Sequence, residues 1–391
     1  MLKLIKNGKV HAPDYLEQKD ILLIGDKIGY IAEQIDEPKN FVDIEVIDAS
    51  GKLVVPGFID SHVHILGGGG EGGFKTRTPE IQLTDLTRGG VTTVVGCLGT
   101  DGTTRSMAGL LAKARGLEEE GITTFIYTGN YAVPVRTITG NIQDDIIMID
   151  KVIGVGEIAI SDHRSAQPTV QEITRIAAEA RVGGILSGKA GIVNIHVGSG
   201  SRKVDFLLDI AENTEIPIKQ FVPTHMNRNQ ELFEQAIYYA KKGGIVDFTT
   251  SSIKKSTDHG EVKSSKALKR MLEEKIDIHQ ITFTSDGQGS LPEFDENGNY
   301  LGLGVGKVIS LYQEVRDAVL DEGVAIETAI RVITSNPADL LKLNGKGYIK
   351  AQYDADLVLL NQDDLQIDTV IAKGQTMILH GDILVKGTFE K

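Results

Sequence analysis

Cysteine is almost absent from this sequence. The 391 residues contain one cysteine, Cys97, so the chain cannot form an internal disulfide and its fold does not depend on an oxidising compartment. Long apolar runs are absent as well, since none approaches the roughly 20 residues that cross a bilayer. The opening letters "MLKLIKNGKVH" are too polar for the apolar core of a signal peptide. These absences predict a cytoplasmic protein that has no membrane-spanning segment.

An excess of positive charge is also missing. Lys and Arg number 41 against 54 Asp and Glu, which gives a formal net charge of −13. Nucleic acids and anionic membranes are polyanions that this charge would repel, so we expect neither as a partner. The content of 41% hydrophobic and 24% charged residues is ordinary for a soluble globular enzyme.

Short β-strand patterns occupy both ends of the chain. Near the start, runs such as "LKLIKNGKVH" and "DILLIGDKIGYIAE" contain the turn signals Asn7-Gly8 and Gly25-Asp26. The end of the chain has similar runs, "ADLVLLNQ" and "IDTVIAKGQTMILHGDILVKG". We predict that residues 1–56 and 347–391 form one small β-sandwich domain, with the rest of the chain inserted between them.

Residues 57–346 follow a different rhythm, in which apolar β-branched runs alternate with amphipathic helical stretches. This alternation is typical of a parallel sheet covered by helices, and eight such units close into a (β/α)8 TIM barrel of the α/β class. A doubly wound open sheet is the competing fold, but no G-x-G-x-x-G opens a helix here. The predicted strands are 57–64, 91–100, 123–130, 152–161, 191–198, 220–227, 244–252 and 281–287.

Histidines and carboxylates gather at the ends of these strands, where a barrel places its reactive groups. In "FIDSHVH" two histidines are one residue apart, so both side chains point to the same face of the strand. Imidazoles and carboxylates suit a transition metal such as Zn²⁺, and six of them exceed the needs of one tetrahedral ion. We therefore expect two Zn²⁺ per subunit that share a bridging carboxylate. The candidate ligands are His62, His64, Glu157, His196, His225 and Asp286.

A structural role remains the plainer interpretation for any one of these histidines alone, and only their joint occurrence favours a metal. His163 lies just past the fourth predicted strand and is left out of the ligand set. His259 is expected to be a surface or structural residue, and "DENGN" at 295–299 a turn. Cys97 lies within the second predicted strand, where a packed small hydrophobe is expected.

Several longer phrases resemble a known family. They are "HVHILGGGGEGG", "RTPEI", "VVGCLGTDG", "RTITG", "AISDHRS", "PTHMNRN" and "SDGQGS". Together with the H-x-H pattern, they resemble the isoaspartyl (β-aspartyl) dipeptidases of the amidohydrolase superfamily, over essentially the whole chain. The resemblance implies metal-dependent hydrolysis of the isopeptide bond of β-aspartyl dipeptides. It also implies a homo-oligomer, of which an octamer is one form.

The resemblance assigns roles to matched positions. Glu71 matches the residue that binds the free α-amino group of the substrate, and Tyr131 the tyrosine that polarises the scissile carbonyl. The groups matched to the substrate carboxylates are Arg164, Arg228 and Ser290, and Gly69 and Thr100 match further substrate contacts. One position departs from the family, because Glu157 stands where a lysine carboxylated on its side chain usually bridges the metals. We expect Glu157 to bridge directly, although its stem is shorter.

The expected mechanism uses a hydroxide that bridges the two ions, with Asp286 as general base and then general acid. The glycines before Glu71 would let the backbone approach a small ligand closely, although a surface loop is the plainer interpretation. Arg164 and Arg228 suit the carboxylates of a short dipeptide, and a structural ion pair is the alternative for each. Two other functions stay open: hydrolysis of another small amide, such as an N-acyl amino acid or a cyclic imide, and a non-catalytic barrel that binds or assembles.

Overall fold

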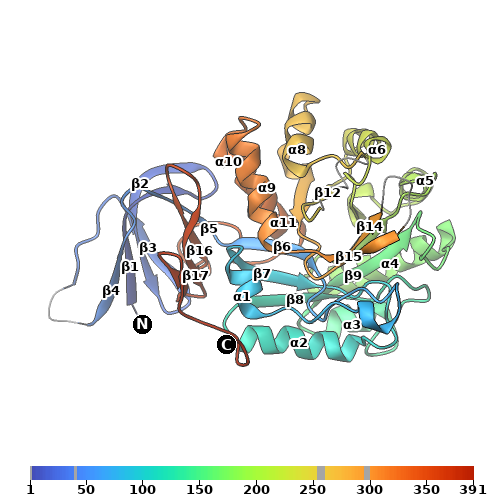
Figure 1. Ribbon diagram of the computed structural model, residues 1–391, viewed down its shortest axis with the longest axis horizontal. Coiled ribbons are helices and arrows are strands. Elements are labelled where there is room, and N and C mark those ends of the chain that lie inside the picture. Colours follow the sequence, from blue (N-terminus) through green and yellow to red (C-terminus); the bar gives the residue numbers. More distant parts are fainter. Residues whose placement is uncertain (1, 39–41, 253–259, 295–299) are drawn as a thin grey trace.

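The structure is a computed structural model that describes residues 2–38, 42–252, 260–294 and 300–391 (Figure 1). His259 and the turn predicted at 295–299 lie outside these ranges. Within them, no helix has both the length and the hydropathy needed to cross a bilayer.

A curled parallel sheet forms the larger part of the molecule (Figure 1). Strands β6 to β11 neighbour one another in chain order, and β12 pairs in parallel with β13. Between β11 and β12 the Met226 amide donates to the Asp247 carbonyl oxygen at 3.2 Å. The circle closes where Val63 bridges Gly287, next to the His64 amide, which donates to the Gly287 carbonyl oxygen at 2.9 Å. The eight strands are β6 (Phe58–Val63), β7 (Val91–Gly96), β8 (Thr123–Thr128), β9 (Val152–Ile160), β10 (Ile192–Val197), β11 (Phe221–Thr224), β12 (Val246–Thr249) and β13 (Ile281–Thr284).

Helices connect these strands and bury one face against them. In α4, Ile173, Ile176 and Ala180 are buried, as the spacing of an amphipathic helix requires. A capping box between Thr169 and Glu172 begins α4 and left-handed Gly188 ends it. The helices are α1 (Leu83–Thr87), α2 (Met107–Glu119), α3 (Ile142–Met148), α4 (Val170–Ser187), α5 (Asp205–Asn213), α6 (Gln230–Lys241), α8 (Ser264–Glu273), α9 (Ile309–Leu320), α10 (Ile326–Ala329) and α11 (Ser335–Leu340), with short 3₁₀ turns η1 (Phe74–Thr76), η2 (Ile218–Gln220), η3 (Ile278–Gln280) and η4 (Ile330–Ile333).

The two ends of the chain share a second sheet, which lies beside the barrel in Figure 1. Strand β16 pairs antiparallel with β5, and this pairing joins the C-terminal strands to the N-terminal ones. The predicted fold class, an α/β barrel with a β domain drawn from both termini, is therefore confirmed, whereas the limits at residues 57 and 347 stay predictions. The strands of this sheet are β1 (Leu2–His11), β2 (Tyr15–Ile24), β3 (Lys27–Ala32), β4 (Ile44–Asp48), β5 (Lys52–Pro56), β16 (Leu357–Asn361), β17 (Ile367–Ala372), β18 (Gln375–Leu379) and β19 (Asp382–Ile383).

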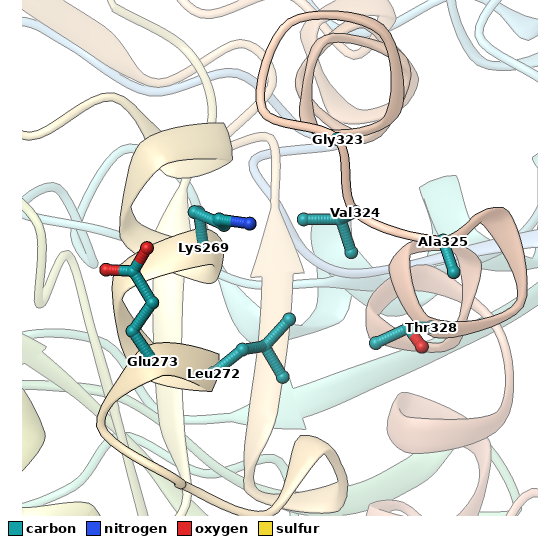
Figure 2. Close-up of a pocket in the computed structure, with 7 residues that line it drawn as sticks. All are labelled: Lys269, Leu272, Glu273, Gly323, Val324, Ala325 and Thr328. Carbon is teal, nitrogen blue, oxygen red and sulfur yellow. The ribbon is translucent and has the colours of Figure 1, made fainter.

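Two further features complete the outline. A hairpin of β14 (Ser290–Phe294) and β15 (Tyr300–Val305) follows β13. A surface pocket lies between α8 and the start of α10, where Lys269 and Leu272 face Val324 (Figure 2). None of the predicted site residues lines this pocket, so the candidate site is sought at the strand ends.

Candidate active site

Glu157 of β9 stands at the centre of a group of four histidines. Its Oε2 lies 3.3 Å from His62 Nε2, 3.3 Å from His196 Nδ1 and 3.8 Å from His225 Nε2. Its Oε1 lies 3.4 Å from His64 Nε2. Burial alone would raise the pKa of Glu157, but the charge of His62 and hydrogen bonds from His196 and His225 hold it well below its usual range. We call these four histidines and Glu157 the histidine cluster.

The strand ends explain why this cluster forms. His62 lies on β6 and His64 just after it, and both side chains reach the same carboxylate, as the alternation along the strand predicts. His225 follows β11 with a φ of 63°, and Asp286 follows β13 with a φ of 53°. Left-handed backbone is uncommon for residues other than glycine and persists only where the surroundings determine it.

Asp286 lies against the histidine cluster. Its Oδ1 is 3.0 Å from His64 Nε2 and 3.8 Å from His62 Nε2. Burial raises the pKa of Asp286, but the hydrogen bond and charge of His64 outweigh burial and hold the pKa at about 2. Asp286 is therefore ionised at neutral pH and can accept a proton.

Three polar residues orient the histidines from outside, and the sequence interpretation gave none of them a role. His62 Nδ1 lies 3.0 Å from Asn194 Oδ1, His225 Nδ1 lies 2.6 Å from Thr249 Oγ1, and His196 Nε2 lies 3.0 Å from Asp162 Oδ2. Such contacts fix the tautomer and the ring orientation of a metal-binding imidazole. Asn194 could have been found from the sequence, because it precedes His196 by two residues on one strand.

The protonation of His225 also suits metal binding. Burial, followed by the charges of Arg228 and His196, lowers the pKa of His225 to about 3. The His225 imidazole is therefore neutral at physiological pH, the form that binds a metal. In contrast, although burial disfavours its charged form, the charges of Cys97 and Glu157 raise the pKa of His62 well above its usual value.

The donor atoms fit a centre for divalent metal ions. Two groups of residues each bring their possible ligand atoms within 4.8 Å of one another. The first group is His62, His64, Cys97 and Glu157, and the second is Glu157, His196 and His225. His62 Nε2 is buried and makes no well-aligned hydrogen bond to any described residue, although Glu157 Oε2 lies 3.3 Å away. Buried polar atoms without partners are rare, and imidazole with carboxylate is a typical donor set for borderline divalent ions.

Cys97 packs as a small apolar residue, as predicted, and also lies near the histidine cluster. It is buried and belongs to an apolar cluster with Val95 and Tyr127, as a packed small residue would. Its sulfur also belongs to the first ligand group, 3.9 Å from His64 Nδ1. The strand pattern in the sequence does not show that the Cys97 sulfur lies near the histidine cluster.

A second set of predicted residues meets around Glu71. Thr100 Oγ1 donates to Glu71 Oε1 at 3.2 Å, Arg164 Nη1 lies 3.3 Å from the same oxygen, and Ser290 Oγ donates to Glu71 Oε2 at 3.2 Å. These four residues, which we call the Glu71 group, come from three connecting segments and from the first residue of β14.

The glycine run shapes the segment that carries Glu71. The Gly70 amide donates to the Thr76 carbonyl oxygen at 3.2 Å, and Gly69 bridges Arg77. Gly69 has a φ of 71°, and a Cβ built there would lie 2.6 Å from the Thr76 carbonyl oxygen. Only glycine fits this turn, which folds the loop back on itself and holds Glu71 toward Thr100.

Tyr131 lies between the two groups. Its Oη is 2.7 Å from His196 Nδ1, and the Arg164 guanidinium lies 5.6 Å from the centre of its ring. Burial, followed by the charge of Glu157, raises the pKa of Tyr131 well above its usual value, so the hydroxyl keeps its proton.

The two predicted arginines differ in their partners. Arg164 Nε and Nη2 bind the two oxygens of Asp162 at 3.0 and 2.8 Å, so most of its fork has a partner within the protein. The half-buried Arg228 side chain makes no ion pair with any described residue. Its charge acts on Tyr131 and His225, which places the guanidinium near the site.

Comparison with known proteins identifies the family of this chain. The model of the Amidohydrolase family matches residues 53–377. The β-aspartyl dipeptidase of Fervidobacterium islandicum AW-1, solved in complex with a β-Asp-Leu dipeptide, is 50% identical with a TM-score of 0.92, over 98% of this chain and 97% of that one. Another structure of β-aspartyl dipeptidase from this organism is 48% identical with a TM-score of 0.89, over 98% of each chain.

More distant similarities concern the fold or a single segment. A D-hydantoinase that is 17% identical has a TM-score of 0.70 and shares the fold. The dihydroorotase of Staphylococcus aureus Mu50 is 52% identical over 93 residues, which are 24% of this chain and 20% of that enzyme, so the match spans a fifth of its length. The family match over most of the chain and the 50% identity over nearly all of it lead to one assignment. This chain belongs to the amidohydrolase family and, within it, to the β-aspartyl dipeptidases.

Proposed function

We propose that this protein hydrolyses the isopeptide bond of β-aspartyl dipeptides at a divalent metal centre. The observation that carries the proposal is the position of Tyr131, which touches both the histidine cluster and Arg164 of the Glu71 group. A metal-binding cluster and a set of charged substrate-binding residues therefore adjoin. Similarity at 50% identity to an enzyme crystallised with β-Asp-Leu supports this substrate class.

The histidine cluster and Asp286 would hold two ions, and zinc is the proposed metal because imidazole and carboxylate donors suit it. His62, His64 and Asp286 would bind one ion and His196 and His225 the other, with Glu157 between them. When bound, divalent ions lower the pKa of water toward about 7 and polarise a carbonyl.

Asp286 is the proposed proton carrier. Because its carboxylate is ionised at neutral pH, it can accept the proton of the attacking water at Oδ1. The same oxygen then returns that proton to the nitrogen of the leaving amino acid, so that a neutral amine departs.

Tyr131 is the proposed donor to the substrate carbonyl. Its hydroxyl keeps its proton because burial and the charge of Glu157 disfavour the phenolate. A donated hydrogen bond strengthens as negative charge develops on the carbonyl oxygen, so the tyrosine stabilises the transition state more than the substrate.

The Glu71 group would select the substrate. Glu71 accepts hydrogen bonds from the substrate ammonium, in exchange for its present contacts with Thr100 and Ser290. Arg228 binds a carboxylate, and so does the Nη1 edge of Arg164 in exchange for its present contact with Glu71. Gly69 supplies backbone contact. A frame with charged groups of both signs suits a short dipeptide with free termini.

Hydrolysis of a cyclic amide is the second candidate, since the 93-residue segment is 52% identical to a dihydroorotase. A panel of β-Asp-Leu, α-Asp-Leu, N-acetylated amino acids, dihydroorotate and hydantoin separates the candidates, assayed by amine release or ring opening. We expect turnover of β-Asp-Leu at least a hundredfold above the others. Turnover of a cyclic amide with no cleavage of β-Asp-Leu would reject the proposal. Homo-oligomeric assembly and a cytoplasmic location remain proposals that rest on the sequence.

A further inference from the structure

We propose that Cys97 is a metal ligand, whose thiolate binds the same ion as His62 and His64. This inference rests on the proposed function and deepens it, because it adds a sulfur donor to one of the two metal positions. Nothing in the strand pattern requires a cysteine to stand at this place. Its position relative to the cluster carries the inference.

The backbone brings Cys97 to the mouth of the barrel. Cys97 directly follows β7, and its amide donates to the Val63 carbonyl oxygen at 3.0 Å, which extends the pairing of β7 with β6. The thiol is fully buried, 3.6 Å from the same carbonyl oxygen and 3.9 Å from His64 Nδ1. It therefore stands on the neighbouring strand at the level of the first two histidines.

The distances allow one ion to share the donors of the first ligand group, with Asp286, which the proposed function places on the same ion, as a fifth protein ligand. The Cys97 sulfur and one ligand atom each from His62, His64 and Glu157 lie within 4.8 Å of one another. A zinc ion with bonds of about 2.0–2.3 Å places its ligand atoms about 3.5 Å apart. Donors up to 4.8 Å apart must therefore move closer by about 1 Å to meet one ion at His64 Nε2, the nitrogen that faces Glu157 and Asp286.

One observation besides these distances points to a ligand, and another shows how closely the segment packs on the donors. His62 Nε2 is buried, faces the group and makes no well-aligned hydrogen bond to a described residue. Gly99, two residues after Cys97, has no room for a side chain, because a Cβ there would lie 2.9 Å from His64 Cε1 and 3.3 Å from Glu157 Oε1. The segment after β7 therefore packs directly against His64 and Glu157.

The alternative is a buried thiol that packs with Val95 and Tyr127 and donates weakly to the Val63 carbonyl oxygen. The two roles predict different chemistry. A ligand thiol loses its proton when the metal binds, whereas a packed thiol does not. Because only one of the two ligand groups contains sulfur, the two metal positions differ in their donor atoms. Softer metals should prefer the position next to Cys97.

Cobalt substitution tests the proposal without relying on activity. The full-length protein is exchanged to Co²⁺ and titrated while its absorption spectrum is recorded. A thiolate bound to Co²⁺ gives a near-ultraviolet charge-transfer band, and Cys97 is the only thiol of the chain that could produce it. We expect this band to saturate at one Co²⁺ per chain.

Two variants sharpen the test. Cys97→Ser should abolish the charge-transfer band, keep the visible bands of histidine-bound Co²⁺, and weaken one class of cobalt sites at least tenfold. Val95→Ala, a loss of buried volume on β7 two residues before Cys97, should leave the spectrum unchanged.

The outcomes separate this proposal from the proposed function. If the wild-type protein shows visible cobalt bands but no charge-transfer band, Cys97 is not a ligand, and cleavage of β-Asp-Leu by the same preparation still supports the function. If the band is present but no dipeptide is cleaved, the ligand assignment stands and the function fails. If equilibrium dialysis finds no bound Co²⁺, both are overturned.

Discussion

The histidine cluster and the Glu71 group adjoin but are built in different ways. The five residues of the cluster stand on or directly after parallel strands, and all are buried to 5% exposure or less. The Glu71 group comes from connecting segments and the first residue of the β14–β15 hairpin, and the Glu71 side chain keeps 25% of its surface exposed. A rigid strand layer can hold reactive groups in fixed geometry, while loops above it can adapt to a ligand. We infer that the cluster controls chemistry and the Glu71 group controls recognition.

The largest effect is expected where the cluster meets the proton carrier. Asp286→Asn should lower kcat by about 10²–10⁴-fold, because the amide cannot accept the proton that the buried carboxylate accepts. Thermal unfolding, measured by calorimetry, should stay close to that of the wild type. Because Asp286 is also a proposed ligand, kcat is compared at metal contents matched by elemental analysis. Near-normal turnover would place proton transfer on another group.

Removing the centre of the cluster should change metal content. Glu157→Ala takes away the one carboxylate that all four histidines face, so we expect retention of about one ion per chain instead of two. Asp145→Ala is the matched control, because Asp145 is also fully buried but binds Thr128 and the 138–139 backbone. The control should lose stability without losing metal. Unchanged metal content in Glu157→Ala would show that this glutamate does not bridge.

Tyr131 tests the boundary between the two groups. Tyr131→Phe should lower kcat by about 10²–10³-fold with little change in KM, because its hydroxyl is expected to act on the transition state. Tyr239→Phe removes a buried hydroxyl that donates to the Ile218 carbonyl oxygen, and it should leave kcat unchanged. A rise in KM without loss of kcat would assign Tyr131 to ground-state binding instead.

Glu71 should affect recognition more than chemistry. Glu71→Gln removes the negative charge that faces the substrate ammonium, so KM for β-Asp-Leu should rise about 10–100-fold while kcat falls less. Glu80→Gln changes a carboxylate 3.4 Å from Lys113 and should have no effect on either constant. Equal losses of kcat and kcat/KM in Glu71→Gln would mean that Glu71 acts on the transition state. Recognition would then not be confined to the Glu71 group.

The same contrast explains what the sequence could predict. Strand periodicity placed His62, His64, His196 and His225 at one mouth of a barrel, because parallel strands align their ends whatever the loops do. The meeting of Glu71 with Ser290 joins segments more than 200 residues apart that follow no periodic pattern, so only family resemblance indicated it. Thr249 escaped notice because a threonine at a strand end is common, and the partner that gives it a role comes from another strand.

The smallest effect is expected from the glycine turn that carries Glu71. Gly69 and Gly51 share a φ of 71°, but a Cβ would meet the Thr76 carbonyl oxygen at 2.6 Å in the first and nothing within 4 Å in the second. Each glycine-to-alanine change should cost about 1–2 kcal/mol of unfolding free energy for the left-handed backbone. Only Gly69→Ala should also raise KM, by a few fold, because the added methyl displaces the loop and with it Glu71. Calorimetry and steady-state kinetics on both variants measure the two effects separately. If Gly69→Ala and Gly51→Ala have the same KM for β-Asp-Leu, substrate recognition does not depend on the position of this loop.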